Sequence, residues 1–245
     1  MASKHGWKIE LIPFDHSSPE HVQRLYDQRV ACGWRADEVH SALQWVDAAK
    51  KGGRMFYWAL FSDTLPDREK LVKQHTEAYP KESSPLRDTS AEIRLVPRQP
   101  TMVEFLPIGH VSVDVHTPEE DVRLGLPPTG TVWIHALYIS RALHGGGFGA
   151  GTMSKIEALV AQSPMDAKIV ALDTISKDLQ TDPEKRDLLY GDGRIPAPVV
   201  ANEDWYNSLG YDQFRREDNV FVTIAKGGVS MPSKYISKFY RFFYH

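Results

Sequence analysis

The alternation of hydrophobic and polar positions predicts several β-strands along the chain. Residues 7–14 alternate apolar and polar side chains, and Val111, Val113 and Val115 lie on one face of a predicted strand over 108–117. The stretch 54–63 contains a continuous apolar run, as a strand buried on both faces does; 131–140 predicts another buried strand, and 168–175 predicts a further strand. The chain therefore contains enough strands for a central sheet.

Helical spacing separates these strands. In the stretch 17–33, Ser18 is suited to cap a helix, Pro19 to occupy its first turn and Gly33 to end it. Apolar residues at helical spacing predict three more helices, over 36–50, 147–161 and 202–209. Strands and helices thus alternate along most of the chain.

Two polar connections and the C-terminal tail do not fit this regular pattern. Residues 63–107 are rich in proline and charge, with one short strand candidate at 91–97, and residues 176–201 are also polar. We expect both to be insertions into a single domain that spans residues 1–245. The tail, 226–245, is strongly aromatic. We expect four of its side chains to cover a sheet edge or form an oligomer contact: Phe239, Tyr240, Phe242 and Phe243.

The order of the elements predicts the fold class. The stretches 211–217 and 219–225 predict a hairpin, and most other neighbouring strands have connections suited to antiparallel pairing. Only the crossover from 131–140 to 168–175, which contains a glycine-rich loop and a helix, suits a parallel pair. We therefore predict a mixed α/β (α+β) domain with a mostly antiparallel central sheet.

Composition and charge exclude several classes of protein to which this chain could belong. The chain has 245 residues, of which 42% are hydrophobic and 25% charged, and its net charge is -3 at pH 7. This charge gives no reason to expect a nucleic acid or an anionic membrane as a partner. A single cysteine, Cys32, excludes an internal disulfide, and no stretch approaches the roughly 18 apolar residues of a membrane span. The first residues lack the layout of a secretory signal, so we expect a cytoplasmic protein.

A glycine-rich loop is the most informative local feature. Five glycines stand among the seven residues from Gly145 to Gly151. The first N–H groups of a helix lack partners within it, so glycine there lets an anion, typically a pyrophosphate, approach them. The Gly-Lys-Ser/Thr sequence of a Walker loop is absent. Gly145, Gly147 and Ala150 match the dinucleotide pattern G-x-G-x-x-A. Asp173, however, lies 28 residues after the first glycine, rather than the roughly 20 expected.

Two motifs resemble the GNAT superfamily of N-acetyltransferases, which bind acetyl-CoA. Leu137-Tyr138-Ile139 is similar to the family's strand end, and His144-Gly145-Gly146-Gly147-Phe148-Gly149 to its pyrophosphate loop. The family's later tyrosine motif is matched by Tyr206, four residues before Gly210-Tyr211. The resemblance is clear over 131–225. It implies helices on both faces of the sheet and one parallel strand pair that splays apart beside the CoA site.

The resemblance also implies which residues contact acetyl-CoA. The loop would hold the pyrophosphate, largely through its main chain, and the strand end would pair with the pantetheine arm. His144 stands where the family has arginine or glutamine, so a permanent charge is missing there. The expected CoA-binding residues are Leu137, Tyr138, Ile139, His144, Gly145, Gly146, Gly147, Phe148, Gly149 and Ala150.

Acetyl transfer to an amine needs a base for the amine and an acid for the departing thiolate. The resemblance implies that Tyr206 is the general acid; the alternative is that it packs its helix onto the sheet. His135 stands where many family members carry a glutamate, so it is either the general base or a core histidine. Asp114 and His116 are further candidate bases. We expect no metal site, because His110, Asp114 and His116 on one strand rarely converge on one ion.

The acceptor is expected to be the primary amine of a small molecule or peptide. Trp34 and Asp37 would line its pocket in the fold that the resemblance implies, although packing between helices is the favoured interpretation of Trp34. Acidic residues that could attract a cationic amine are Asp114, Glu119, Glu120 and Asp121. The expected partners are acetyl-CoA and this amine, without nucleic acid or membrane, and a homodimer stays open. Two alternative functions also stay open: a catalytically weak acyl-CoA-binding regulatory domain, and an NAD(P)-dependent oxidoreductase.

Overall fold

The computed structural model describes residues 5–33, 43–191, 193, 196–217, 221–224, 230–233 and 236–242. The chain divides into two compact units: unit 1 comprises residues 1–116 and 134–167, and unit 2 comprises residues 117–133 and 168–245. Strand β8, Thr131–Ile139, belongs to unit 2 at its start and to unit 1 from residue 134 onward.

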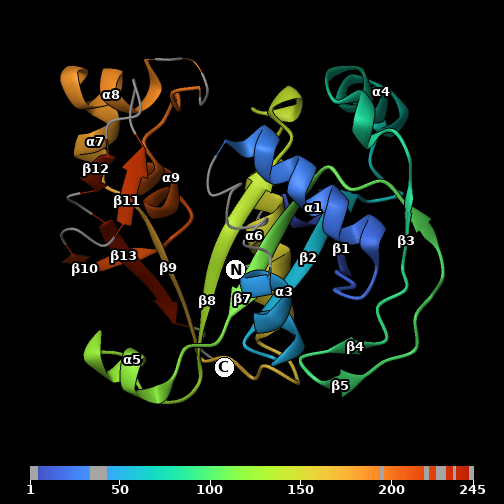
Figure 1. Ribbon diagram of the computed structural model, residues 1–245, viewed down its shortest axis with the longest axis horizontal. Coiled ribbons are helices and arrows are strands. Elements are labelled where there is room, and N and C mark those ends of the chain that lie inside the picture. Colours follow the sequence, from blue (N-terminus) through green and yellow to red (C-terminus); the bar gives the residue numbers. More distant parts are fainter. Residues whose placement is uncertain are drawn as a thin grey trace. The chain divides into compact units, whose positions relative to one another are not determined.

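Unit 1 is built on a sheet with the strand order β1-β2-β7-β8 (Figure 1). The first three of these strands are β1, Ile9–Pro13; β2, Arg54–Phe61; and β7, Gly109–Asp114. They pair antiparallel, with Ile9 opposite Phe61 and Arg54 opposite Asp114. Strand β2 is buried along almost its whole length, as its continuous apolar run predicts.

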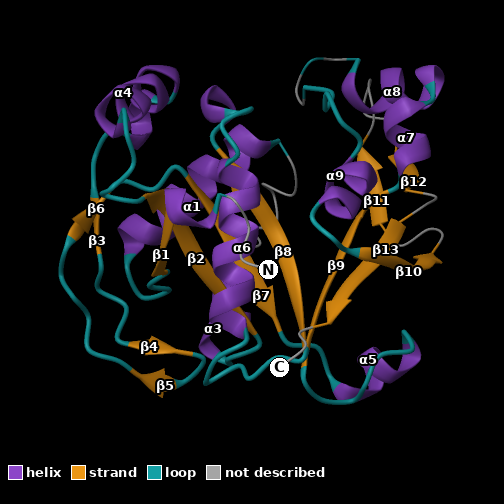
Figure 2. Ribbon diagram, turned by 180° about the vertical axis from the view of Figure 1, so that it is seen from behind, coloured by secondary structure: helices purple, strands orange, loops and turns teal. Residues whose placement is uncertain are grey.

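Helices cover both faces of this sheet (Figures 1 and 2). Helices α1, Pro19–Cys32, and α3, Leu43–Lys50, pack on one face through a cluster that includes Leu25 and Trp45. Helix α6, Phe148–Val160, contributes Phe148 to a second cluster on the opposite face. The predicted helix over 36–50 begins in a stretch, 34–42, that lies outside the described residues.

Local signals place the ends of α1 as predicted. The Ser18 side chain accepts a hydrogen bond from the His21 N–H, and Pro19 occupies the first turn. Gly33 follows the helix with a φ of 78°, a conformation that glycine adopts readily. Both ends are therefore fixed by residues within the helix's own sequence.

The insertion over 63–107 is more regular than its sequence predicts. It contains helix α4, Arg68–Ala78, and a 3-10 helix, η2, Pro80–Glu82, neither of which has a strong apolar stripe. The expected strand at 91–97 is instead a hairpin of two short strands, β4, Glu92–Ile93, and β5, Val96–Pro97. Outside this hairpin, β3, Leu86–Arg87, pairs with β6, Glu104–Phe105.

Polar contacts hold this insertion together. Asp88 is buried, and its carboxylate accepts hydrogen bonds of 2.6 and 2.8 Å from the guanidinium of Arg98. The Thr101 hydroxyl donates to the same carboxylate at 2.7 Å. A fold maintained by such contacts leaves no hydrophobic periodicity in the sequence, which explains why the prediction missed its elements.

Unit 2 contains the start of β8 and three further strands in the order β8-β9-β13-β10. These three are β9, Ile169–Ile175; β10, Asp212–Glu217; and β13, Ile236–Phe242. Strands β8 and β9 are the parallel pair of a mostly antiparallel sheet, as predicted. Trp133 and Ile169 lie in a buried cluster with Leu124 and Leu126.

The C-terminal region corrects two predictions. Strand β10 pairs with β13 rather than with residues 219–225, and β13 also pairs with β9. Residues 221–224 form β11, Phe221–Ile224, which pairs with β12, Ser230–Ser233. The aromatic tail therefore supplies a strand between β9 and β10 instead of covering a sheet edge. In this position it forms hydrogen bonds with the backbone N–H and C=O groups of both neighbouring strands. Phe243 lies outside the described residues.

Short helices complete unit 2. The second polar connection contains α7, Lys177–Thr181, and α8, Pro183–Tyr190, and it leads to α9, Asn202–Ser208. The Asn202 side chain donates to the Thr174 hydroxyl of β9 at 3.0 Å, and the Asn202 N–H donates to Gln180 Oε1 at 2.8 Å. These bonds anchor the start of α9 to β9 and α7.

An additional short helix, α5, Pro118–Arg123, contains three of the acidic residues that the sequence analysis expects to attract a cationic amine. Glu120 forms a reciprocal capping box with Thr117. Asp121 is buried, and its carboxylate accepts a hydrogen bond from the Trp133 indole at 2.8 Å. Both acids therefore have structural roles.

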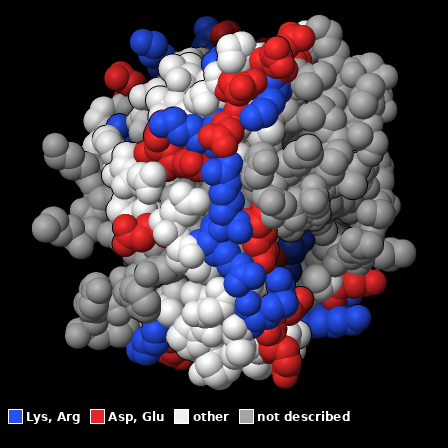
Figure 3. Space-filling view, turned by 90° about the vertical axis from the view of Figure 1, so that its left-hand side faces the viewer, with Lys and Arg blue, Asp and Glu red and all other residues white. Residues whose placement is uncertain are grey.

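Several surface charges in unit 2 form ion pairs. Glu217 lies 3.2 Å from Arg123 and 3.1 Å from Arg215, and Lys177 lies 2.9 Å from Asp204. On the face drawn in Figure 3, basic side chains form a stripe that is bordered by acidic ones. Exposed pairs of this kind contribute little to stability individually.

Candidate functional site

Strand β8 contains an extra residue in the middle of the predicted site. His135 contacts Asp114, and Tyr138 contacts His110, although a two-residue period would place residues 135 and 138 on opposite faces. Asp114 and His110 lie four residues apart on β7 and therefore share one face. Ala136 has a φ of 49°, which is uncommon for a residue with a side chain. The strand thus has a β-bulge at His135 and Ala136, which periodicity could not predict.

The glycine loop adopts conformations that favour glycine. Gly145 and Gly147 have φ values of 83° and 77°, and Gly147 directly precedes helix α6. A Cβ on Gly146 would lie 2.3 Å from the ring of Phe148, so the protein's own packing excludes a side chain there. By contrast, a Cβ on Gly145 would have no described atom within 4 Å. The open space in the loop is therefore beside Gly145.

The start of α6 presents backbone N–H groups without partners. The first hydrogen bond of the helix runs from the Gly151 N–H to the Gly147 carbonyl at 2.9 Å. The N–H groups of Phe148, Gly149 and Ala150 precede it, and none of them donates to another group in the described part of the chain. Together with the helix dipole, these donors make the loop suited to bind an anion.

Side chains around the loop bind its carbonyl groups. The Lys8 ammonium donates to the Gly146 carbonyl at 2.8 Å and lies 5.6 Å from the centre of the Phe148 ring. His144 donates from Nε2 to the Ile139 carbonyl at 3.1 Å. The His144 ring thus ties the loop to the end of β8, and anion binding is left to the main chain.

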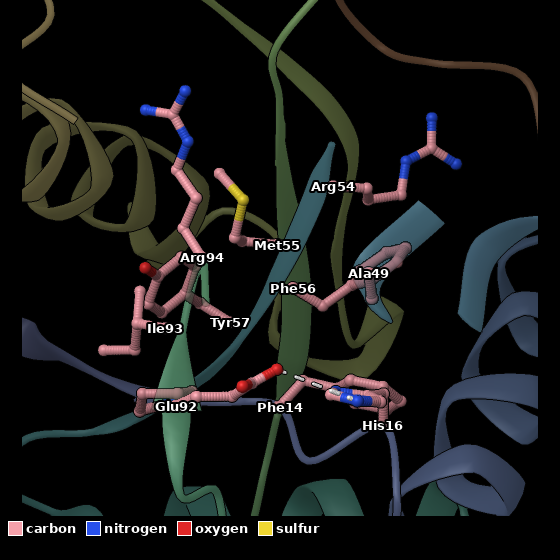
Figure 4. A pocket seen from close by; sticks show the side chains of 11 residues that line it. Phe14, His16, Ala49, Arg54, Met55, Phe56, Tyr57, Glu92, Ile93 and Arg94 are labelled. Carbon is pink, nitrogen blue, oxygen red and sulfur yellow. Dashed lines mark ion pairs between the residues drawn. The ribbon is translucent and has the colours of Figure 1, made fainter. Parts of the chain in front are cut away.

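A cavity of about 450 Å³ lies beside this loop within unit 1. That volume is within the range of small-molecule sites. Its lining combines an exposed indole, two lysines and loop backbone, and it includes Trp7, Lys8, Lys70, Gln74, His144 and Gly146. A smaller cavity of about 30 Å³ borders Arg54, His16 and Glu92 and has room for little more than a water molecule. In Figure 4 the Arg54 side chain extends away from the His16–Glu92 pair.

His135 belongs to a row of three polar side chains on neighbouring strands. Its Nδ1 lies 2.9 Å from Asp114 Oδ2. Arg54 donates from Nε to both Asp114 oxygens, at 2.8 and 3.0 Å, and its terminal nitrogen also contacts Oδ2. Burial raises the pKa of Asp114, but the bonds from His135 and Arg54 outweigh it and bring that pKa to about 2. Asp114 is therefore anionic at neutral pH and is itself a poor base.

His110 lies in a separate, fully buried network. Its Nδ1 donates to Gln28 Oε1 at 2.7 Å, and Gln28 Nε2 donates to Glu82 at 2.6 Å. His75 Nε2 lies 3.5 Å from the same carboxylate. Burial and the charge of Arg29 lower the pKa of His110 well below its usual range. His110 is therefore a neutral core histidine rather than a member of a site with Asp114.

Tyr206 lies on α9 in unit 2. Its ring is half-buried, with centroid distances of 4.8 Å to Trp205 and 5.9 Å to Tyr211. Burial raises the pKa of Tyr206 above its usual range, and the carboxylate of Asp173 on β9 raises it further. The hydroxyl is therefore protonated at neutral pH, as a general acid must be.

The remaining predicted residues divide into three groups. Leu137 is half-buried, whereas the side chains of Tyr138 and Ile139 are buried, so any ligand contact of these two would be through the backbone. His116 stacks on His135 with a centroid distance of 5.9 Å. The third group, Trp34 and Asp37, lies outside the described residues.

The described residues contain neither a candidate metal centre nor a helix that could cross a membrane. No group of three or more His, Cys, Asp or Glu side chains is placed to hold a metal ion. No helix there combines the length and the apolar character that crossing a membrane requires.

Sequence reasoning named Asp114 as a reserve base and as one of the acids that could attract a cationic amine, and it did not name Arg54. The two residues are 60 positions apart, and nothing local in the sequence pairs them. The one available signal was the placement of Arg54 at the start of an otherwise apolar strand next to the strand that carries Asp114. The register of β2 and β7 sets the two residues opposite each other.

No protein-family model and no curated protein matches this sequence. Solved structures do resemble it. NAA60 of Arabidopsis thaliana in complex with acetyl-CoA has a TM-score of 0.51 and 12% identity, over 96% of this chain and 98% of that chain. The same protein with a bisubstrate analogue has a TM-score of 0.50 and 13% identity, over 96% and 97% of the two chains. A putative acetyltransferase of the GNAT family from Desulfovibrio desulfuricans has a TM-score of 0.49 and 9% identity, over 96% and 98%.

The likeness to NAA60 extends over almost the whole chain at low identity and therefore concerns the fold. It confirms the mixed α/β architecture with one parallel strand pair that the motifs predict. The chain thus has the fold of the GNAT acetyltransferases.

Proposed function

We propose that this chain is an acetyl-CoA-dependent N-acetyltransferase that acts on the primary amine of a small molecule or peptide by direct attack in a ternary complex. The observation that carries the proposal is the set of N–H groups at the start of α6 that have no partner among the described residues, behind a glycine loop at the end of β8. This arrangement suits a pyrophosphate, and the same fold binds acetyl-CoA in NAA60. We propose a single domain with insertions at 63–107 and 176–201, in the cytoplasm.

The residues present fit acetyl-CoA as a co-substrate. The N–H groups of Phe148, Gly149 and Ala150 hold its pyrophosphate, with room beside Gly145. The backbone of the 137–139 stretch pairs with the pantetheine arm. When bound, acetyl-CoA supplies an acetyl group activated as a thioester. No residue in this arrangement needs a metal ion.

Two side chains manage the protons. His135, whose Nδ1 contacts Asp114, is the general base for the proton that the attacking amine loses. Tyr206 keeps its proton at neutral pH and donates it to the departing thiolate. Both roles are supported by the resemblance of these positions to the family and by the contacts of the two side chains in this structure.

A thiol-release assay tests the proposal. The purified chain is incubated with acetyl-CoA and a panel of peptides, amino acids, polyamines and aminoglycosides, and free thiol is measured. We expect turnover with at least one amine. Tyr206→Phe should lower kcat by about 10²-fold or more, with the KM for acetyl-CoA near the wild-type value. Tyr190→Phe is the matched control, because it also removes a buried hydroxyl in unit 2, one that accepts from Gln180 at 3.0 Å.

The other outcomes separate the alternatives. Binding of acetyl-CoA without turnover would favour a regulatory domain, a possibility that the engagement of His144 with Ile139 supports. A fluorescence change with NADH and none with acetyl-CoA would favour an oxidoreductase. Either result would overturn the proposed activity.

A further inference from the structure

The insertion that contains α4 forms one wall of the cavity beside the glycine loop. Helix α4 packs Leu71 onto the buried cluster that contains Leu143 and Phe148, which flank the loop. The Gln74 side chain donates to the Ala142 carbonyl, which lies just before the loop. Helix α4 is therefore held against the loop, and the cavity of about 450 Å³ lies where the two meet.

Two lysines bring positive charge to this cavity. Lys70 comes from α4, and it forms no ion pair or hydrogen bond in the described part of the chain. Lys8 comes from the 3-10 helix η1, Gly6–Lys8, and donates to the Gly146 carbonyl at 2.8 Å. A lysine ammonium has three donors, and Lys8 has no carboxylate partner among the described residues. Both ammonium groups are therefore available to an anionic ligand.

The rest of the lining suits the sugar and base of a nucleotide. Among the described lining residues Asp67 is the one acid, and a carboxylate can accept a hydrogen bond from a ribose hydroxyl. Trp7 is 51% exposed and gives the cavity an aromatic wall, against which a purine ring can pack. Gly146 and Phe148 also line the cavity, so it adjoins the N–H groups that suit a pyrophosphate.

We propose that this cavity binds the 3′-phosphoadenosine end of acetyl-CoA, with Lys70 and Lys8 on the 3′-phosphate. This inference rests on the proposed function, which has the pyrophosphate at the start of α6. In CoA the ribose that bears the 3′-phosphate is attached directly to the pyrophosphate, so the two anionic groups occupy adjoining places. The insertion thereby makes the protein selective for CoA over dephospho-CoA, which lacks the 3′-phosphate. A free nucleotide has the same chemistry, and competition with CoA separates the two sources.

Calorimetric titration of the full chain with CoA and with dephospho-CoA measures this selectivity without an acceptor amine. The wild type should bind CoA about 5-fold or more tightly than dephospho-CoA, and added salt should reduce the difference by screening the exposed charges. Lys70→Gln should weaken the binding of CoA about 5-fold and leave that of dephospho-CoA unchanged, because only CoA carries the group that Lys70 contacts. Equal affinity of the wild type for both compounds, or an equal loss for both in Lys70→Gln, would overturn the inference.

Lys73→Gln is the matched control. Lys73 is an exposed lysine of the same helix, but it lies 3.7 Å from Glu77 and does not line the cavity. This variant should bind both compounds like the wild type, and Lys70→Arg, which keeps the positive charge, should retain the preference for CoA. Loss of the preference in Lys73→Gln would indicate a general effect of the charge on α4 and would overturn the specific role of Lys70.

Adenosine 3′,5′-bisphosphate identifies the source of the nucleotide. At millimolar concentration it should displace CoA from the wild type, and Lys70→Gln should weaken this competition. A bisphosphate that binds together with CoA, or that fails to displace it, would overturn the inference. Absence of CoA binding by the folded wild type would overturn the proposed function and this inference with it. Turnover of acetyl-CoA combined with equal affinity for CoA and dephospho-CoA would overturn the inference alone.

Discussion

Single buried residues of unit 1 illustrate how burial sets protonation. His110 on β7 is fully buried and donates from Nδ1 to Gln28, so its ring is neutral. Its environment is therefore opposite to that of His135, which lies beside an anionic carboxylate on the next strand. Two histidines on neighbouring strands thus have different roles because their partners differ.

The neutral state of His110 makes the stability of the protein sensitive to mild acid. Its pKa is depressed in the folded chain, whereas it is near 6.5 in the unfolded chain. Below that pH the unfolded chain binds an extra proton, so the free energy of unfolding should fall by up to about 1.4 kcal/mol per pH unit. In His110→Asn, whose amide can still donate to Gln28, the slope between pH 6.5 and 5 should be shallower by about this amount.

Urea denaturation followed by tryptophan fluorescence at several pH values measures this slope. His21, whose pKa burial also lowers, contributes equally to both proteins and cancels in the difference. Identical slopes for the wild type and the variant would contradict the assignment of a neutral, buried His110.

Short local motifs let the sequence name most of its candidate site residues. The glycines, His144 and Tyr206 were all named from short patterns, and the structure gives the loop the conformations that such a pattern needs. The pairing of Arg54 with Asp114 was not predictable, because it depends on strand register over 60 positions. Gly146 was named as a CoA-binding residue, and the structure adds a separate reason for glycine there, because a Cβ on it would lie 2.3 Å from the Phe148 ring.

Elements with strong local signals were predicted well, and elements that depend on distant partners were not. Helix α1 has its cap, its first-turn proline and its terminal glycine in sequence, and it forms where they indicate. Strand β13 lies between β9 and β10, although the sequence favoured a nearby hairpin for β10. A hairpin between β10 and the next segment would need a shorter connection. The longer connection to β13, however, gives both β9 and β10 a hydrogen-bonded partner strand.

The central position of β13 can be tested with a proline. Lys238 stands opposite Asp173 of β9 and Arg215 of β10. Lys238→Pro removes its backbone N–H and distorts the strand, so it should destabilise unit 2 by about 3 kcal/mol or more. Hydrogen exchange in β9 and β10 should accelerate, whereas Lys238→Thr, which keeps the N–H, should exchange like the wild type. Unchanged protection in the proline variant would contradict the strand order.

At the scale of the whole molecule, fold and function rest on different evidence. The architecture is shared with NAA60 at 12% identity, and a fold alone does not specify an activity. The proposed activity depends instead on the loop before α6, where N–H groups with no partner in the described part of the chain lie beside open space at Gly145. Acetyl-CoA must bind through this loop if the proposed activity is right.

Calorimetric titration of the full chain with acetyl-CoA measures this binding. We expect saturable binding at one site, weakened about 10-fold or more by Gly145→Ala, because the added methyl group enters the phosphate space; this corresponds to about 1.4 kcal/mol. Gly125→Ala is the control, since Gly125 has a φ of 85°, close to the 83° of Gly145, and equally open surroundings outside the loop. It should bind like the wild type. If the folded wild-type chain does not bind acetyl-CoA, or if Gly145→Ala binds it with equal affinity, the loop is not a CoA site.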